Sequence, residues 1–143
     1  MAAVHNPPVP MRVFARRQTR TLLRRVANQL NRASQPAGPE AVHDLRVAIR
    51  RFSRCLRLFS QFLPRGKAKR VRRQLRDVMD LAAAVRDRDI ALELLKQARV
   101  PARASLAVTL RRERREAGLK LRAAARRLGQ RDFSRKCRAW LRL

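Results

Sequence analysis

The chain has 143 residues, and 37 Lys and Arg against 10 Asp and Glu give it a formal net charge of +27. The length suffices for one helical domain with a modest core, and a hydrophobic content of 45% excludes a disordered basic tail. No apolar run reaches the length that spans a membrane, and the high charge predicts a polyanionic partner that screens the self-repulsion.

Residues 1–10 hold three of the seven prolines, and we predict a flexible Pro-rich arm there. They lack the basic start and the apolar stretch of a secretory signal, so we expect a cytoplasmic protein. Cys55 and Cys137 fall in helical patterns without metal-ligand spacing, which favours free thiols in a reducing compartment.

The first predicted helix covers about residues 11–32. Its expected inward residues recur at steps of three and four, and they are Phe14, Thr21, Leu22, Val26 and Leu30. A loop follows over residues 34–39, and Pro39 at its end fits the first position of the next helix.

The clearest pattern in the chain lies between residues 39 and 63. One apolar stripe is formed by Val42, Leu45, Ile49, Phe52, Leu56, Phe59 and Leu63. Such a stripe predicts a helix with one face on a core, which Pro64 and Gly66 bring to an end.

Further helices are predicted at about 67–85, 88–98, 101–129 and 132–143, with Asp87 as the cap of the second of these. Their expected inward residues are Val71, Leu75, Val78, Ala82, Val85, Leu92, Leu95, Leu106, Leu110, Ala117, Leu121, Ala124, Leu128, Phe133, Cys137 and Trp140. No strand-like alternation is present, and short connections favour antiparallel neighbours. We therefore predict an all-α fold over residues 11–143, an antiparallel helical bundle of about five to six helices that resembles a four-helix bundle.

The 39–63 helix carries a second face, which we call the basic ridge. It consists of His43, Arg46, Arg50, Arg54 and Arg57. At about 100° per residue from Val42 these residues fall between about 40° and 120°, whereas the apolar stripe centres at about 300°. The ridge is about 21 Å long, and its like charges repel one another. A linear ligand with repeating phosphates would offset this repulsion, because each Arg can bind successive oxygens in a bidentate manner.

His43 lies in the first helical turn, beside free backbone N–H groups that favour anions, and its ring can donate a hydrogen bond to phosphate. The alternatives are a His that packs locally and a ridge that is only the solvated face of a basic protein. We favour binding for the ridge because no acidic residue interrupts it.

Other helices add basic residues to the candidate site. From the 67–85 helix we include Arg72, Arg73 and Arg76, although spacing alone does not say which of them face the ridge. The acidic residues cluster at Asp77, Asp80, Asp87, Asp89 and Glu93. This cluster could hold a divalent metal, but caps and internal ion pairs that fix a turn between helices explain it better. We predict no metal and no cofactor.

Two segments resemble the CHAD domain, the conserved-histidine α-helical domain. Residues 42–51, VHDLRVAIRR, are similar to the family's V-H-x-x-R-V-x-x-R-R run, and residues 86–89, RDRD, to its R-D-x-D segment. The tail, 128–141, is similar to the closing helix of a family repeat, and the likeness covers about 11–143. The resemblance implies a helical fold that binds inorganic polyphosphate through a basic surface and associates with polyphosphate granules.

The motif match implies binding roles for His43, Arg46, Arg50 and Arg51, whereas Arg54 and Arg57 come from the helical wheel. Arg51 falls at about 180° on that wheel, off the centre of the ridge. Family members look like two similar halves around a basic channel, and this chain matches only the first half. Either the sequence is a fragment, or two copies assemble as a homodimer that rebuilds the channel.

Two other classes of function are alternatives to a non-catalytic polyphosphate-binding module. A general nucleic-acid binder is disfavoured because the chain has no Tyr, one Trp and five Phe, which leaves few rings for stacking on bases. An enzyme is disfavoured because the chain lacks G-x-x-x-x-G-K-[ST], H-E-x-x-H and a glycine-rich phosphate loop.

Overall fold

The computed structural model describes residues 10–143, apart from the side chain of Gln130, so nearly all of the predicted Pro-rich arm lies outside the described residues. The described part consists of five α-helices and one short 3₁₀ helix, with no strand. Their order is α1 (Met11–Ala33), α2 (Pro39–Leu58), η1 (Ser60–Phe62), α3 (Lys67–Gln97), α4 (Ser105–Gln130) and α5 (Phe133–Leu141). The predicted all-α class and helical bundle are confirmed.

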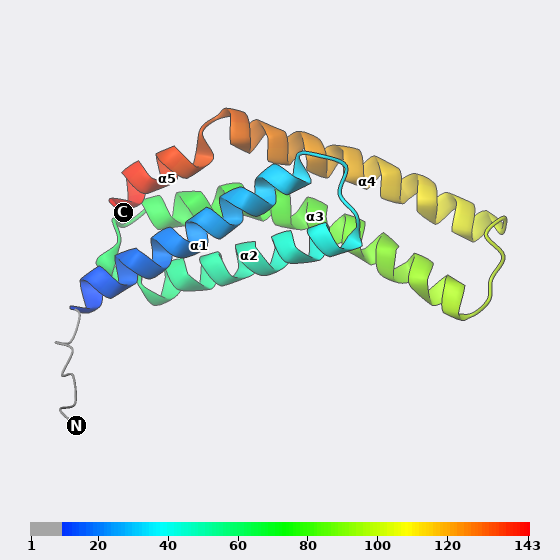
Figure 1. The fold of residues 1–143 in the computed structure, drawn as a ribbon, viewed down its shortest axis with the longest axis horizontal. Helices are drawn as coiled ribbons and strands as arrows, with labels where there is room; N and C mark the ends of the chain where they lie inside the picture. Colours follow the sequence, from blue (N-terminus) through cyan, green and yellow to red (C-terminus); the bar gives the residue numbers. More distant parts are fainter. Residues whose placement is uncertain (1–9) are drawn as a thin grey trace, which may run out of the picture.

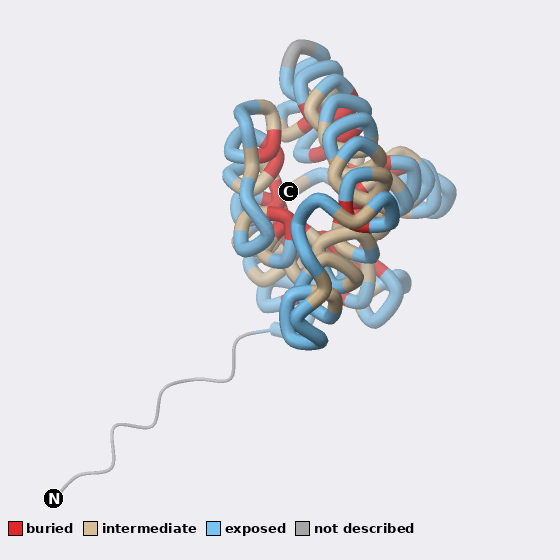
Figure 2. Tube along the Cα trace, turned by 90° about the vertical axis from the view of Figure 1, so that its right-hand side faces the viewer, coloured by how far each residue is buried: buried red, intermediate tan, exposed pale blue. Residues whose placement is uncertain are grey.

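Each of the four long helices packs mainly on two of the others. α1 packs on α2 and α4, and α3 packs on the same two helices from the other side (Figure 1). The short α5 lies against the ends of α1, α3 and α4. Figure 2 shows the buried positions gathered on the inner sides of the helices, where they form one core.

The predicted apolar stripe of α2 lies in this core. Val42, Leu45, Ile49, Phe52 and Leu56 are buried, together with Cys55, and so is the predicted inward face of α3 from Val71 to Val85. α2 nevertheless ends at Leu58, five residues before the predicted end. Pro64 disfavours the helical conformation for the residue before it, and Leu63 is extended, with φ −115° and ψ 151°, although its side chain remains buried.

α3 runs without interruption through the predicted break at residues 86–88, so the proposed cap at Asp87 was wrong. No Gly or Pro interrupts this segment. Its charged side chains form ion pairs with α4 and do not cap a helix end. Arg88 pairs with Glu113 of α4 at 3.3 Å, and Asp89 pairs with Arg114 of α4 at 3.0 Å. The RDRD segment thus makes the predicted internal ion pairs, but they join α3 to α4 and do not fix a turn.

Two inward faces were also predicted wrongly in part. In α1 the buried residues include Ala15, Thr19 and Leu23, whereas Phe14 is 41% exposed and meets Phe59 edge-on at a ring distance of 6.0 Å. Thr19 of α1 lies against Cys55 of α2, with 3.5 Å between Oγ1 and Sγ, whereas the ring of Phe14 lies at the flank of this contact. In α4, which begins at Ser105 and not at Pro101, Leu106 is 55% exposed.

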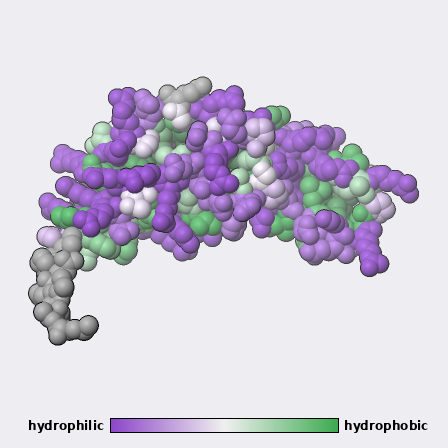
Figure 3. Space-filling view, viewed as in Figure 1, coloured by the Kyte–Doolittle hydropathy of each residue, from purple (hydrophilic) through white to green (hydrophobic). Residues whose placement is uncertain are grey.

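The second half of α3 and the first half of α4 extend beyond the other helices as a pair, which we call the α3–α4 arm (residues 86–97 and 105–120) (Figure 1). Ala107 is the one buried residue of this arm. Several of its large apolar side chains are exposed, namely Ile90, Leu94, Leu106, Val108 and Leu119. Apolar surface is visible at the arm's end of the molecule in Figure 3, where most of the remaining surface is hydrophilic.

Candidate functional site

A basic groove lies between α2 and α3, with a volume of about 340 Å³. We call it the α2–α3 groove, and its lining consists of Ile49, Arg50, Ser53, Arg54, Arg57, Arg72, Leu75, Arg76 and Met79. The predicted residues from the two helices therefore meet here: three arginines of the basic ridge face two arginines of α3.

Helix geometry explains this arrangement. Arg50, Arg54 and Arg57 are separated by four and three residues, and Arg72 and Arg76 by four, so each set follows one side of its helix. α2 and α3 are joined by a short connection and pack side by side, which brings the last turn of α2 next to the second turn of α3. The core residues Ile49 and Leu75 form an apolar floor under the guanidinium groups.

The groove is strongly electropositive because no carboxylate lines it. The four ion pairs found within the described residues all lie elsewhere and involve none of its five arginines. Asp44, one of the two acidic residues of α2, pairs with Arg32 of α1 at 3.4 Å. The Nε atom of Arg72 is buried without a hydrogen-bond partner, so this guanidinium retains an unused donor.

The other predicted site residues do not line the α2–α3 groove. His43 is exposed in the first turn of α2, and Arg46 is half-buried, with an Nε atom that lacks a partner. Arg51 and Arg73 are exposed. The groove thus brings together five of the nine predicted residues, while His43 and Arg46 continue the ridge toward the start of α2.

Sequence reasoning missed Ser53 and Met79, both of which line the groove. Ser53 falls at about 20° on the wheel of α2, between the apolar stripe and the ridge, so the wheel could have found it. Its hydroxyl group adds a hydrogen-bond donor between the arginines. Met79 lies one turn beyond Leu75 and supplies apolar lining.

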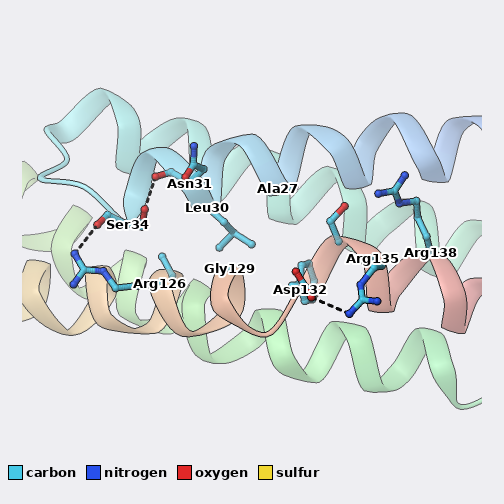
Figure 4. Close-up of a pocket in the computed structure, with 12 residues that line it drawn as sticks. Ala27, Leu30, Asn31, Ser34, Arg126, Gly129, Asp132, Arg135 and Arg138 are labelled. Atoms are coloured by element: carbon cyan, nitrogen blue, oxygen red, sulfur yellow. Dashed lines mark hydrogen bonds and ion pairs between the residues drawn. The ribbon is translucent and has the colours of Figure 1, made fainter.

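A larger hollow, of about 430 Å³, lies between α1, α4 and α5 (Figure 4). Two of its three arginines already have partners in the protein: Arg126 donates to the carbonyl oxygen of Ser34 at 3.4 Å, and Arg135 pairs with Asp132 at 2.9 Å, which leaves Arg138. The Asp132 carboxylate also belongs to the lining. An anion there would compete with bonds that exist, so this hollow is the weaker candidate.

The described residues offer little for covalent or metal chemistry. Cys55 and Cys137 are buried and unpaired with each other, and desolvation raises the pKa of both thiols, that of Cys137 to about 12. Neither thiol is therefore a ready nucleophile at neutral pH. Within residues 10–143 no three His, Cys, Asp or Glu side chains gather as metal ligands, and none of the helices has the length and apolarity to cross a bilayer.

Comparison with known proteins gives one family. The family model of the CHAD domain matches residues 17–143, which is most of the chain. No curated protein and no solved structure matches.

Proposed function

Because the chain belongs to the CHAD domain family, whose members are associated with polyphosphate binding in general and are not generally catalytic, we propose that it binds inorganic polyphosphate without turning it over. The observation that carries this proposal is the convergence of five arginines, without a carboxylate, in the α2–α3 groove. Binding of long chains would also bring the protein to polyphosphate granules in the cytoplasm.

A phosphate chain suits the groove better than a single anion. From Arg50 to Arg57 the α2 side of the groove spans about 10 Å, and the ridge as far as His43 spans about 21 Å. Arginines on both walls can each bind oxygens of successive phosphates through two N–H groups. The ligand charge would also relieve the repulsion among guanidinium groups that now have no acidic partner.

A titration of long-chain polyphosphate, followed by calorimetry at two salt concentrations, tests the proposal. The variant Arg50→Ala/Arg54→Ala should bind about a hundredfold more weakly or worse, because each charged hydrogen bond contributes roughly 1.5–3 kcal/mol. Arg24→Ala/Arg25→Ala is the matched control, since it removes the same charge from exposed positions of α1. Equal losses in the two variants would mean diffuse attraction to the charged surface and would overturn the proposed site.

General nucleic-acid binding is the alternative function, and it would also depend steeply on salt. It is less well supported because the groove lining contains no aromatic ring on which bases could stack. Competition separates the two functions. If duplex DNA or RNA displaces bound polyphosphate at equal phosphate concentration, the nucleic-acid reading is the better one. Phosphate release from polyphosphate above the blank would in turn argue for an enzyme.

We also propose that two copies of the chain associate through the α3–α4 arm. The arm has one buried residue and exposes Ile90, Leu94 and Leu106. Its two helical segments therefore have no core of their own, whereas a bundle of four helices would bury these side chains. Docking the same arm of a second copy would complete a four-helix arrangement and cover this apolar surface.

The oligomeric state in solution tests the association. Light scattering should give twice the chain mass of 16.6 kDa, and Ile90→Glu/Leu94→Glu should reduce it to one chain. Leu58→Glu is the control, because Leu58 is 73% exposed on α2, away from the arm. A mass of 16.6 kDa for the unchanged protein, with and without polyphosphate, refutes the dimer.

A further inference from the structure

A second basic hollow lies on the other side of α3. We call it the α3–α5 hollow; it has a volume of about 290 Å³ and is lined by Arg70, Gln74, Leu128, Arg131, Phe133, Lys136 and Trp140. Its size is close to the lower end of the range for ligand sites, about 300 Å³. An adjoining hollow of about 270 Å³ shares Gln74, Leu128 and Arg131 with it, so the two form one longer depression along α3.

The cations of this hollow have no acidic partner. Arg70, Arg131 and Lys136 take part in none of the ion pairs that the described residues form, and no carboxylate belongs to the lining. The adjoining hollow contains one carboxylate, that of Asp77, which Arg127 accompanies. Three unpaired cations that converge from α3, α5 and the segment between α4 and α5 favour an anionic ligand.

An aromatic ring positions one of these cations. The guanidinium carbon of Arg70 lies 4.6 Å from the centre of the Trp140 ring. Such a stack restrains the guanidinium group and leaves its N–H groups available at the edge of the ring.

The hollow is connected to the α2–α3 groove by a band of positive charge. At about 100° per residue around α3 from Arg72, Arg76 lies at about 40°, Lys69 at about 60°, Arg73 at about 100° and Arg70 at about 160°. Asp77 and Asp80, at about 140° and about 80°, follow these residues along the helix and border the band. Lys69, Arg70, Arg73 and Arg76 are all exposed. A flexible anion could therefore follow these residues around the solvent side of α3 from the groove to the hollow.

We propose that the α3–α5 hollow is a second phosphate-binding site, so that a long polyphosphate occupies the α2–α3 groove and bends around the first half of α3. The proposal rests on the proposed function for its ligand, but the hollow is a separate site that binds a short phosphate chain by itself. Phosphate oxygens there bind Arg131, Lys136 and the edge of Arg70, and they change the surroundings of Trp140.

Trp140 is the one tryptophan in the chain, so its fluorescence reports on this hollow and not on the groove. Titration of the full chain with tripolyphosphate should give a saturable change in emission. Arg131→Ala/Lys136→Ala replaces two exposed residues of the hollow. It should lower the affinity measured from the change in emission about tenfold or more, while the heat of binding at the groove remains. Arg50→Ala/Arg54→Ala should lose the heat of binding at the groove and keep the change in Trp140 emission. The control Arg24→Ala/Arg25→Ala should alter neither the heat of binding nor the emission.

The outcomes distinguish this site from the groove. Binding detected by calorimetry without any change in Trp140 emission overturns the second site and leaves the proposed function intact. A change in emission that survives in Arg131→Ala/Lys136→Ala, or that is lost in Arg50→Ala/Arg54→Ala, also overturns it. ATP carries the same three phosphates, so a response to ATP without one to tripolyphosphate would assign the hollow to a nucleoside instead.

Discussion

Arg114 of α4 donates through Nε to Oδ1 of Asp89 on α3 at 3.0 Å, and the same guanidinium group donates to the carbonyl oxygen of Ala37 at 2.9 Å. The two side chains retain only 23% and 8% of their exposure. Arg114 thereby joins α3, α4 and the loop between α1 and α2 at the base of the α3–α4 arm. Truncation of Arg114 would leave the Asp89 carboxylate desolvated and without a counter-charge.

We therefore expect Arg114→Ala to lower the free energy of unfolding by about 3 kcal/mol, since loss of one partner strands a buried charge. Urea denaturation at neutral pH measures the change. The control is Arg115→Ala, the exposed neighbour, which should shift stability by less than about 0.5 kcal/mol. If the free energy of unfolding falls by similar amounts in Arg114→Ala and Arg115→Ala, the ion pair between Arg114 and Asp89 adds nothing beyond the charge of one arginine.

The turn before α3 depends on the backbone of Gly66, which has φ +77°. A side chain is strained in this conformation, so Gly66→Ala should destabilise the protein by about 1 kcal/mol although nothing lies within 4 Å of the added carbon. Gly129→Ala is a matched control inside α4, where alanine should be neutral or stabilising by up to about 1 kcal/mol. Thermal unfolding compares them, and a stable Gly66→Ala variant would contradict the argument.

The parts of the fold that follow from local periodicity were predictable. The stripe from Val42 to Leu56 specifies the buried face of α2 because alternating steps of three and four leave one face of a helix for the core. The break predicted at Asp87 was wrong because a potential cap is only a local preference, and pairing of Arg88 and Asp89 with α4 outweighs it. The exposure of Phe14 likewise depends on how closely α1 approaches α2, which periodicity does not report.

The candidate site was likewise predictable where it depends on one helix, and not where it depends on how two helices pack. One helical wheel places Arg50, Arg54 and Arg57 together, because their relation is internal to α2. The choice of Arg72 and Arg76, and not Arg73, from the basic residues of α3 depends on the rotation of α3 against α2. That rotation is set by the packing of Val71, Leu75 and Val78 in the core, so only a three-dimensional arrangement reveals it.

The contribution of His43 should depend on the length of the ligand. His43 lies outside the α2–α3 groove, two turns before Arg50 on the same ridge. Tripolyphosphate can be held within the groove, so His43→Ala should leave its affinity unchanged, whereas long-chain polyphosphate should bind roughly three- to tenfold more weakly. Calorimetric titration of both ligands measures this, and His43→Gln, which keeps a donor, should restore part of the loss. Equal losses for the two chain lengths would assign His43 to helix stability instead.

Burial of Cys137 gives the stability of the fold an alkaline dependence. Desolvation raises the pKa of this thiol from 9.0 to about 12 in the folded chain. Between these values the folded state keeps a proton that the unfolded state has lost, so the free energy of unfolding falls as pH rises. The thiol alone contributes a slope of at most about 1.4 kcal/mol per pH unit over this window.

The slope is measured as the difference between the unchanged protein and Cys137→Ala in urea denaturation at about pH 8.5 and about pH 10.5. All other titratable side chains are present in both proteins, so their effect cancels in the difference. The alanine variant should be less stable at the lower pH because it leaves a cavity, and the gap should narrow at the higher pH. A gap that stays constant would mean that the thiolate reaches solvent in the folded protein, contrary to the full burial of Cys137 between α5 and the core.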